Sequence, residues 1–174
     1  MPNPCDQQLF DACRLGSLDK AKSAFADGAD PEAMHQKSKS TPLTYVRMQR
    51  IRAFDAEKGA EQDSSIYGRN SSPAFAPPSD YTKVENLILD KILLKAAGCG
   101  DVGKMEWALD EGASKEAMDP DFEASAVVVA ASAGHFDAVR MLRDRGADMD
   151  KRDIYGMNVW EWISINKPRE SNDI

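Results

Sequence analysis

One glycine spacing occurs three times along this chain of 174 residues, and it constrains the fold more than any other feature. Gly16, Gly100 and Gly134 each stand twelve residues before a Gly-Ala pair. Apolar residues recur around each glycine at the same offsets, namely −7, −4, +2, +5 and +8. Spacings of three or four residues on both sides of a glycine predict two short amphipathic helices that meet at a tight turn.

The repeated offsets define the side chains that we expect to form the core of each unit. They are occupied by Leu9, Ala12, Leu18, Ala21 and Ala24 in the first copy, by Leu93, Ala96, Val102, Met105 and Ala108 in the second, and by Val127, Ala130, Phe136, Val139 and Leu142 in the third. One helix pair cannot bury its own apolar side chains, so the pattern predicts units that stack on one another.

Composition and charge exclude several classes of protein. The chain has 22 basic and 29 acidic residues, a formal net charge of −7, which argues against general affinity for nucleic acid or an anionic membrane. The longest weakly charged apolar run, 124–136, is too short to span a bilayer, and the N-terminus has no signal-peptide pattern. Three cysteines without a C-x-x-C pair and two histidines do not make a usual zinc site. We therefore expect free thiols in a cytoplasmic protein, with the nucleus as the alternative compartment.

The repeated unit resembles the repeat of the ankyrin family, which is about 33 residues long and carries the signature T-P-L-H-x-A. Thr41-Pro42-Leu43 supplies the opening of that signature, and residues 130–148 resemble one nearly complete unit. The resemblance implies an all-α ankyrin-repeat solenoid, in a single domain over residues 1–174. It would have about four helix-turn-helix units, short finger loops and a C-terminal cap.

The implied units differ in regularity. Their approximate bounds are 5–38, 39–61, 81–122 and 123–155, followed by a cap at 156–168. The second unit is degenerate because it lacks the glycine of the turn register, and Pro42–Lys58 is interpreted as one helix or a helix pair. Residues 62–80 have no helical period and form an insertion, after which Tyr81–Ala97 predicts a helix longer than the family standard.

The resemblance implies a non-catalytic protein-protein interaction module: an adaptor, or a small subunit or assembly factor of a larger complex. It would bind another protein through its finger loops and concave groove, without a cofactor or a metal. The finger positions that the resemblance implies for this chain are His35, Gln36, Lys37, Pro120, Asp121, Phe122, Ile154 and Tyr155. The first-helix positions that would face the groove are Arg14, Leu15, Cys99, Ser132 and Ala133. We expect the apolar finger residues to anchor the partner, because they gain the most from desolvation.

Charge is distributed unevenly along the chain. Residues 33–54 contain five basic and no acidic residues, whereas residues 96–124 contain eight acidic and two basic residues. Arg47, Arg50 and Arg52 are therefore expected to steer an acidic patch of the partner.

The insertion at residues 62–80 supports an alternative function. Its two aromatic residues, Tyr67 and Phe75, are expected to anchor it on its own repeats or on a partner. In the second case the protein would be an inhibitor or regulator that acts through the insertion.

A nucleotide-binding enzyme is a less favoured alternative. Gly98–Gly103 satisfies the pattern G-x-G-x-x-G. In this interpretation Lys91–Ala97 would form a buried strand before the glycines, and Lys104–Glu111 would form a helix after them. Lys95 would interrupt that strand, however, and Gly100 belongs to the repeated turn register.

Three smaller predictions concern single side chains. Cys13 occupies a small helix-contact position and is expected to be a buried, inert thiol. Trp107 and Met141 occupy matching second-helix positions and are expected in the core. The three aspartates in 148–153 do not match a calcium-binding loop, and a connection between repeats accounts for them.

Overall fold

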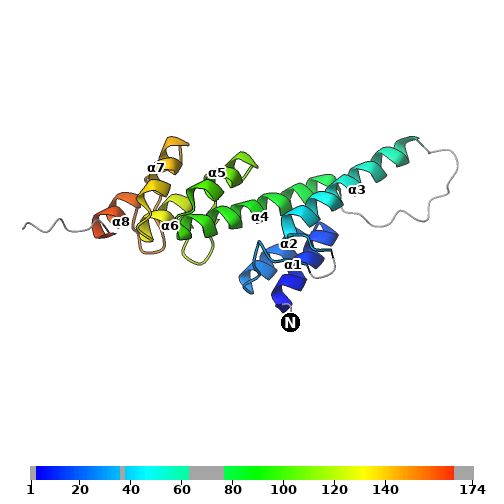
Figure 1. Ribbon diagram of the computed structural model, residues 1–174, viewed down its shortest axis with the longest axis horizontal. Coiled ribbons are helices and arrows are strands. Elements are labelled where there is room, and N and C mark those ends of the chain that lie inside the picture. Colours follow the sequence, from blue (N-terminus) through cyan, green and yellow to red (C-terminus); the bar gives the residue numbers. More distant parts are fainter. Residues whose placement is uncertain (1–2, 36–37, 63–76, 167–174) are drawn as a thin grey trace, which may run out of the picture. The chain divides into compact units, whose positions relative to one another are not determined.

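The computed structural model describes residues 3–35, 38–62 and 77–166, and within 56–62 it describes the helix but not the side chains. This part of the chain is mostly helical, which confirms the all-α prediction, and its two strands have two residues each. The chain divides into two compact units, residues 1–88 and residues 89–174, which are described separately. Figure 1 labels their helices.

The first unit begins with a helix pair that a glycine turn closes. Helix α1 (Pro4–Leu15) ends at Gly16, whose φ of 63° is the left-handed conformation in which many helices end. Helix α2 (Leu18–Ala26) begins directly after Ser17, whose hydroxyl accepts a backbone N–H of its first turn. The two helices pack against each other through the residues that the repeated register predicts.

Two long helices follow, as the sequence predicts for Pro42–Lys58 and Tyr81–Ala97. They are α3 (Pro42–Gln62) and α4 (Pro78–Cys99). Helix α3 is a single helix rather than a pair, since Arg50 stands in the register where the other copies have glycine. It packs against α1, and α4 contributes its first half to the first unit and its second half to the second unit.

The structure describes only the two ends of the predicted insertion at 62–80. Gln62 is the last residue of α3, and residues 78–80 form the first turn of α4, so the prediction of a non-helical segment is wrong at both ends. Proline is readily accommodated in a first helical turn, where no N–H partner is needed. Tyr67 and Phe75 lie outside the described residues.

The second unit contains the end of α4, four further helices and one short hairpin in its described part. The helices are α5 (Val102–Asp110), α6 (Ala126–Ser132), α7 (Phe136–Asp144) and α8 (Val159–Asn166). The strands are β1 (Met118–Asp119) and β2 (Ala124–Ser125), which pair antiparallel between α5 and α6. Helix α6 packs against α7 and α8, and α5 packs against α7.

The apolar register predicted from the sequence forms the observed core. Every residue at offsets −7, −4, +5 and +8 from the three turn glycines is at most 5% exposed, and the residues at +2 are half-buried. The three glycines have φ values of 63°, 72° and 79°, which side-chain-bearing residues rarely adopt. Glycine is therefore required at each turn, and the apolar stripes on both sides of it pack inward.

One core prediction is wrong, because Trp107 is 41% exposed. Helix α5 buries Met105 and Ala108, which set the direction of its packed face. Trp107 follows Met105 by two residues, or about 200° around the helix, and so lies off that face. Met141, at the matching position of α7, is half-buried.

Candidate functional site: two finger loops and their groove

Two loops of the second unit carry the predicted anchor residues. The first finger loop, residues 114–125, joins α5 to α6, and the second finger loop, residues 148–158, joins α7 to α8. In the first loop, Asp119 Oδ1 accepts the backbone N–H groups of Asp121 and Phe122 at 2.9 and 3.2 Å. Because Asp119 is also part of the hairpin, these hydrogen bonds fix the backbone that carries the Phe122 side chain.

The second finger loop is organised around Asp153, which is only 9% exposed. Its Oδ1 accepts the backbone N–H groups of Tyr155 and Met157 at 2.9 and 3.0 Å. Its Oδ2 accepts the indole N–H of Trp162 at 2.8 Å, which ties the loop to α8. Because one carboxylate joins two backbone groups of the loop to a side chain of α8, these hydrogen bonds hold the second finger loop in a fixed conformation.

The two finger loops are also bound to each other. The backbone N–H of Ile154 donates to the carbonyl of Phe122 at 3.0 Å. The Glu116 carboxylate lies 2.6 Å from the Lys151 ammonium and accepts the backbone N–H of Asp148 at 3.1 Å. The hydrogen bond from Lys151 holds the pKa of Glu116 below its ordinary value, so this carboxylate stays ionised at neutral pH.

Four large apolar side chains are exposed on these loops. Met118 is 48% exposed, Phe122 51%, Ile154 48% and Tyr155 64%. The exposure of Phe122, Ile154 and Tyr155 agrees with their predicted position, whereas Met118 was not among the predicted contact residues. Exposed apolar residues are ordinary when scattered, but four on two linked loops form a patch typical of interaction surfaces.

A groove of about 310 Å³ lies beside this patch. Phe122 and Tyr155 line it from the two finger loops, Val128 and Val129 from α6, and Trp162 from α8. Two carboxylates also line it, and among the described residues no basic side chain does. The groove is thus mainly apolar, with negative charge in its wall.

Sequence reasoning missed three residues of this site, namely Asp119, Asp153 and Trp162. Both aspartates open a four-residue turn, 119–122 and 153–156, in which the carboxylate accepts N–H groups two or more residues ahead. Aspartate is common at the start of a turn because its carboxylate accepts these N–H groups. An aspartate at the start of a predicted turn is therefore the sequence signal that identifies Asp119 and Asp153. No comparable signal marks Trp162 within the cap.

The predicted finger residues of the first unit have a different environment. The half-buried His35 ring lies 4.7 Å from the Phe10 ring and 5.9 Å from the Tyr45 ring, between centroids. Its Nδ1 is 2.8 Å from the Ser38 hydroxyl. His35 therefore contributes to packing within its own unit, and Lys37 lies outside the described residues.

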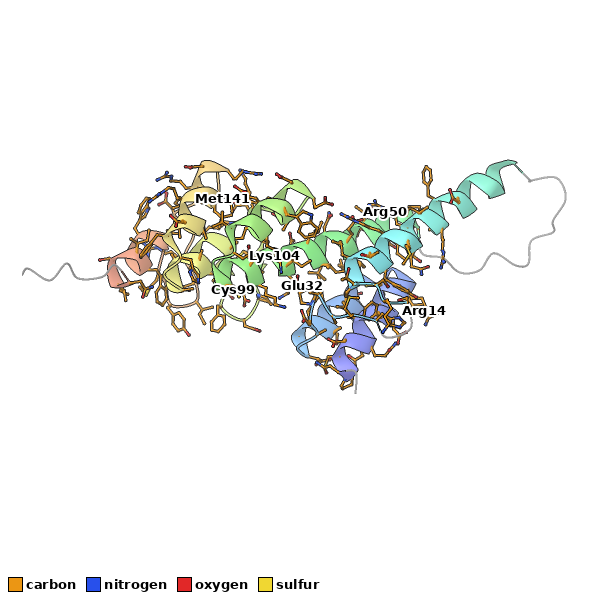
Figure 2. All side chains as sticks on the ribbon, viewed as in Figure 1. Arg14, Glu32, Arg50, Cys99, Lys104 and Met141 are labelled. Carbon is orange, nitrogen blue, oxygen red and sulfur yellow. The ribbon has the colours of Figure 1, made fainter. Side chains whose placement is uncertain are left out.

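Two of the three predicted steering arginines are engaged within the chain. Arg47 Nε and Arg50 Nη1 each lie 2.6 Å from a carboxylate oxygen of Glu85, whose side chain is only 6% exposed. Figure 2 labels Arg50 on α3. Arg52 is exposed. The ion pairs with Glu85 give Arg47 and Arg50 a role in holding α3 to α4. Steering of an acidic partner by the three arginines stays a prediction.

The cysteines are free thiols in three environments. Cys13 is fully buried as predicted, and burial raises the pKa of its thiol to about 12, so it stays protonated and inert. Cys99 is exposed at the end of α4 (Figure 2). The other predicted first-helix positions, Arg14, Leu15, Ser132 and Ala133, are also exposed, and Ser132 lines the groove.

The structure contradicts the local fold that a nucleotide site at Gly98–Gly103 requires. Lys91–Ala97 lies within helix α4 and is not a strand. Gly100 faces the His135 ring so closely that a Cβ there would lie 2.5 Å from its Nδ1. The His135 Nε2 is 3.1 Å from the carbonyl of Gly98. Gly100 therefore makes room for an imidazole that lies against the end of α4, rather than for a phosphate.

This packing predicts different costs for two glycine substitutions. Gly134→Ala introduces a Cβ at φ 79° into open space, and we expect a loss of about 1 to 2 kcal/mol from backbone strain alone. Gly100→Ala has the same strain and also displaces His135, so it should cost about 1 kcal/mol more through the lost hydrogen bond. Urea unfolding of both variants measures the difference, and equal losses would contradict the proposed role of His135.

In the described ranges, no three His, Cys, Asp or Glu side chains gather as a metal site would need. None of the helices there offers an apolar stretch of the length that a bilayer requires. No protein-family model matches the chain, and no curated protein matches it significantly.

Proposed function

We propose that the chain is a non-catalytic interaction module with the organisation of an ankyrin-repeat solenoid, and that it binds a partner protein through its two finger loops. The helix pairs turn at glycines with a left-handed backbone conformation, and they bury apolar residues at the same offsets from those glycines. Both features support the repeat organisation. The hairpin between α5 and α6 supports the comparison with finger loops.

One observation carries the binding function: Phe122 and Tyr155 are exposed although the loops that bear them are fixed by hydrogen bonds. A side chain on a fixed backbone loses little conformational entropy when a partner covers it. Aromatic side chains at the centre of an interface commonly contribute most of its binding energy. The arrangement therefore suits a protein-binding surface.

The hydrogen bonds of Asp153 in the groove support a structural role for this carboxylate rather than acid-base chemistry. Asp153 accepts three N–H groups, which commits both of its oxygens to the structure of the second finger loop. A general base needs an oxygen within reach of a substrate proton. We therefore assign no catalytic step to this site.

The double substitution Phe122→Ala/Tyr155→Ala tests the proposal. We expect it to leave the far-UV circular dichroism and thermal unfolding unchanged, because both side chains are at least half exposed. Affinity purification from cells that express the protein naturally, followed by mass spectrometry, should recover a partner with the wild-type chain and not with the double variant.

A matched control separates this surface from general surface hydrophobicity. Trp107→Ala removes an aromatic side chain of similar exposure from α5, outside the two finger loops. It should retain the partner. Equal recovery by the wild type and the Phe122→Ala/Tyr155→Ala variant would show that the finger loops are not the binding surface.

A further inference from the structure

We infer that the groove between the finger loops receives one apolar side chain of the partner, and that Lys or Arg residues flank this side chain. The inference rests on the proposed function and adds to it the chemistry of the partner segment. It is carried by the size of the groove, by its lining and by the charges around it.

The size and lining of the groove suit a single side chain. Its volume of about 310 Å³ is at the lower limit of the roughly 300 to 1,000 Å³ typical of small-molecule sites. Val128, Val129 and Trp162 line it with apolar surface, and Phe122 and Tyr155 belong to the exposed patch beside it. A leucine or phenylalanine side chain from an extended segment would be desolvated there against apolar and aromatic lining.

The charges around the groove are predominantly negative. Asp119 and Asp153 line it. The two finger loops, 114–125 and 148–158, together contain seven acidic and three basic residues, which gives a net charge of 3 − 7 = −4. A partner segment with positive charge on both sides of its apolar residue is complementary to this surface.

The three basic side chains of the loops are engaged within the chain. Lys115 Nζ donates to the carbonyl of Gly146 at 2.7 Å, Lys151 pairs with Glu116, and Arg152 pairs with Glu161 at 3.1 Å. Lys151 and Arg152 therefore neutralise carboxylates that do not line the groove, and Lys115 binds a backbone carbonyl.

Two acidic residues of the first loop are in a different situation. Asp121 and Glu123, which flank Phe122, are exposed, and neither forms an ion pair within the described ranges. The negative charge next to the apolar patch is therefore available to a partner.

A second groove in the same unit provides a contrast. It has a similar volume of about 290 Å³, is lined by Trp160 and Ile163, and carries Arg140 and Arg143. Arg140 and Arg143 pair with Asp137 and Asp144 of the same helix. No carboxylate among the described residues lines this groove, so it offers a basic segment no negative wall. Charge therefore favours the finger-loop groove over this one for a basic partner segment.

Fluorescence of Trp162 offers a direct test. The chain has three tryptophans, so Trp107→Phe/Trp160→Phe leaves Trp162, in the groove, as the only one. The full-length variant is titrated with three synthetic peptides: Ser-Lys-Arg-Leu-Arg-Lys-Ser, the same peptide with glycine for leucine, and Ser-Glu-Asp-Leu-Asp-Glu-Ser. We expect the basic leucine peptide to shift the emission saturably and to bind at least tenfold more tightly than the other two.

Variants in the same background locate the binding. Ser132→Phe places a ring in the groove and should weaken the basic leucine peptide at least tenfold, whereas the neighbouring Ala133→Phe, which does not line the groove, should leave it unchanged. Asp121→Lys should weaken it several-fold, with a smaller effect at high salt.

Two outcomes would overturn the inference. The first is binding of the acidic peptide as tight as that of the basic one. The second is the absence of any emission change at millimolar peptide. If either occurs while partner recovery still depends on Phe122 and Tyr155, the proposed function stands and only the partner chemistry is wrong. Loss of that dependence would instead remove the proposed function itself.

Discussion

Asp153→Ala is expected to lower the free energy of unfolding of the second unit by about 3 to 4 kcal/mol, since three hydrogen bonds to a nearly buried carboxylate are lost, each contributing about 1 to 1.5 kcal/mol. The substitution leaves two backbone N–H groups and the Trp162 indole N–H without their acceptor. The carboxylate is almost fully buried, so water does not replace it without opening the loop.

Tryptophan fluorescence during urea unfolding measures this effect selectively, because all three tryptophans lie in residues 89–174. Trp162→Phe removes one donor and keeps an aromatic ring, so it should cost about 1 kcal/mol. Asp150→Ala changes an exposed aspartate of the same loop and should stay within about 0.5 kcal/mol of the wild type. A loss below about 1 kcal/mol for Asp153→Ala would contradict its central place in the loop.

Glu85→Ala is expected to destabilise the first unit by about 2 to 3 kcal/mol, because it removes the buried partner of two arginines. The expected loss is below that for a fully buried ion pair, since the Arg47 and Arg50 side chains are about one-third exposed and regain water. Hydrogen exchange of the α3 amides measures it, because α3 and this part of α4 would separate more often.

Two controls distinguish a lost charge pair from lost packing. Lys83→Ala breaks the exposed pair with Asp80 on the same helix and should cost less than about 0.5 kcal/mol. The triple variant Glu85→Met/Arg47→Met/Arg50→Met removes all charges together and should recover most of the stability, since no charge is left unpaired. If it is no more stable than Glu85→Ala, the loss comes from packing.

The core of the helix pairs could be predicted from the sequence because it depends on local spacing. Leu9, Leu93 and Val127 occupy the same offset from a turn glycine, and all three are fully buried. A glycine turn and a three-to-four-residue apolar period fix which face of each helix packs inward. Trp107 stands at offset +7 from Gly100, outside the core offsets +5 and +8, so its position matching that of Met141 does not make it a core residue.

The pairing of α3 with α4 could not be predicted from the sequence in the same way. Glu85 and its two arginines, Arg47 and Arg50, are separated by more than thirty residues, and the segment between the helices has no period that fixes their register. Charged residues on a helix are usually solvated, so the arginines were assigned to partner binding. Only the packed arrangement shows a buried carboxylate between them.

The candidate site was predictable in part. Phe122 and Tyr155 were found by their loop positions, and their exposure follows from the tight turns that Asp119 and Asp153 organise. The groove beside them was not predictable from the sequence, because part of its wall is Trp162, whose indole binds the second finger loop from the following helix.

The measurement that tests the central claim most directly is the affinity of the recovered partner for three purified chains by calorimetry: the wild type, Phe122→Ala/Tyr155→Ala and Trp107→Ala. Two aromatic anchors of about 2 kcal/mol each predict a dissociation constant at least about a hundredfold higher for the double variant. Trp107→Ala should match the wild type. A double variant that binds within about threefold of the wild type would contradict binding through the finger loops.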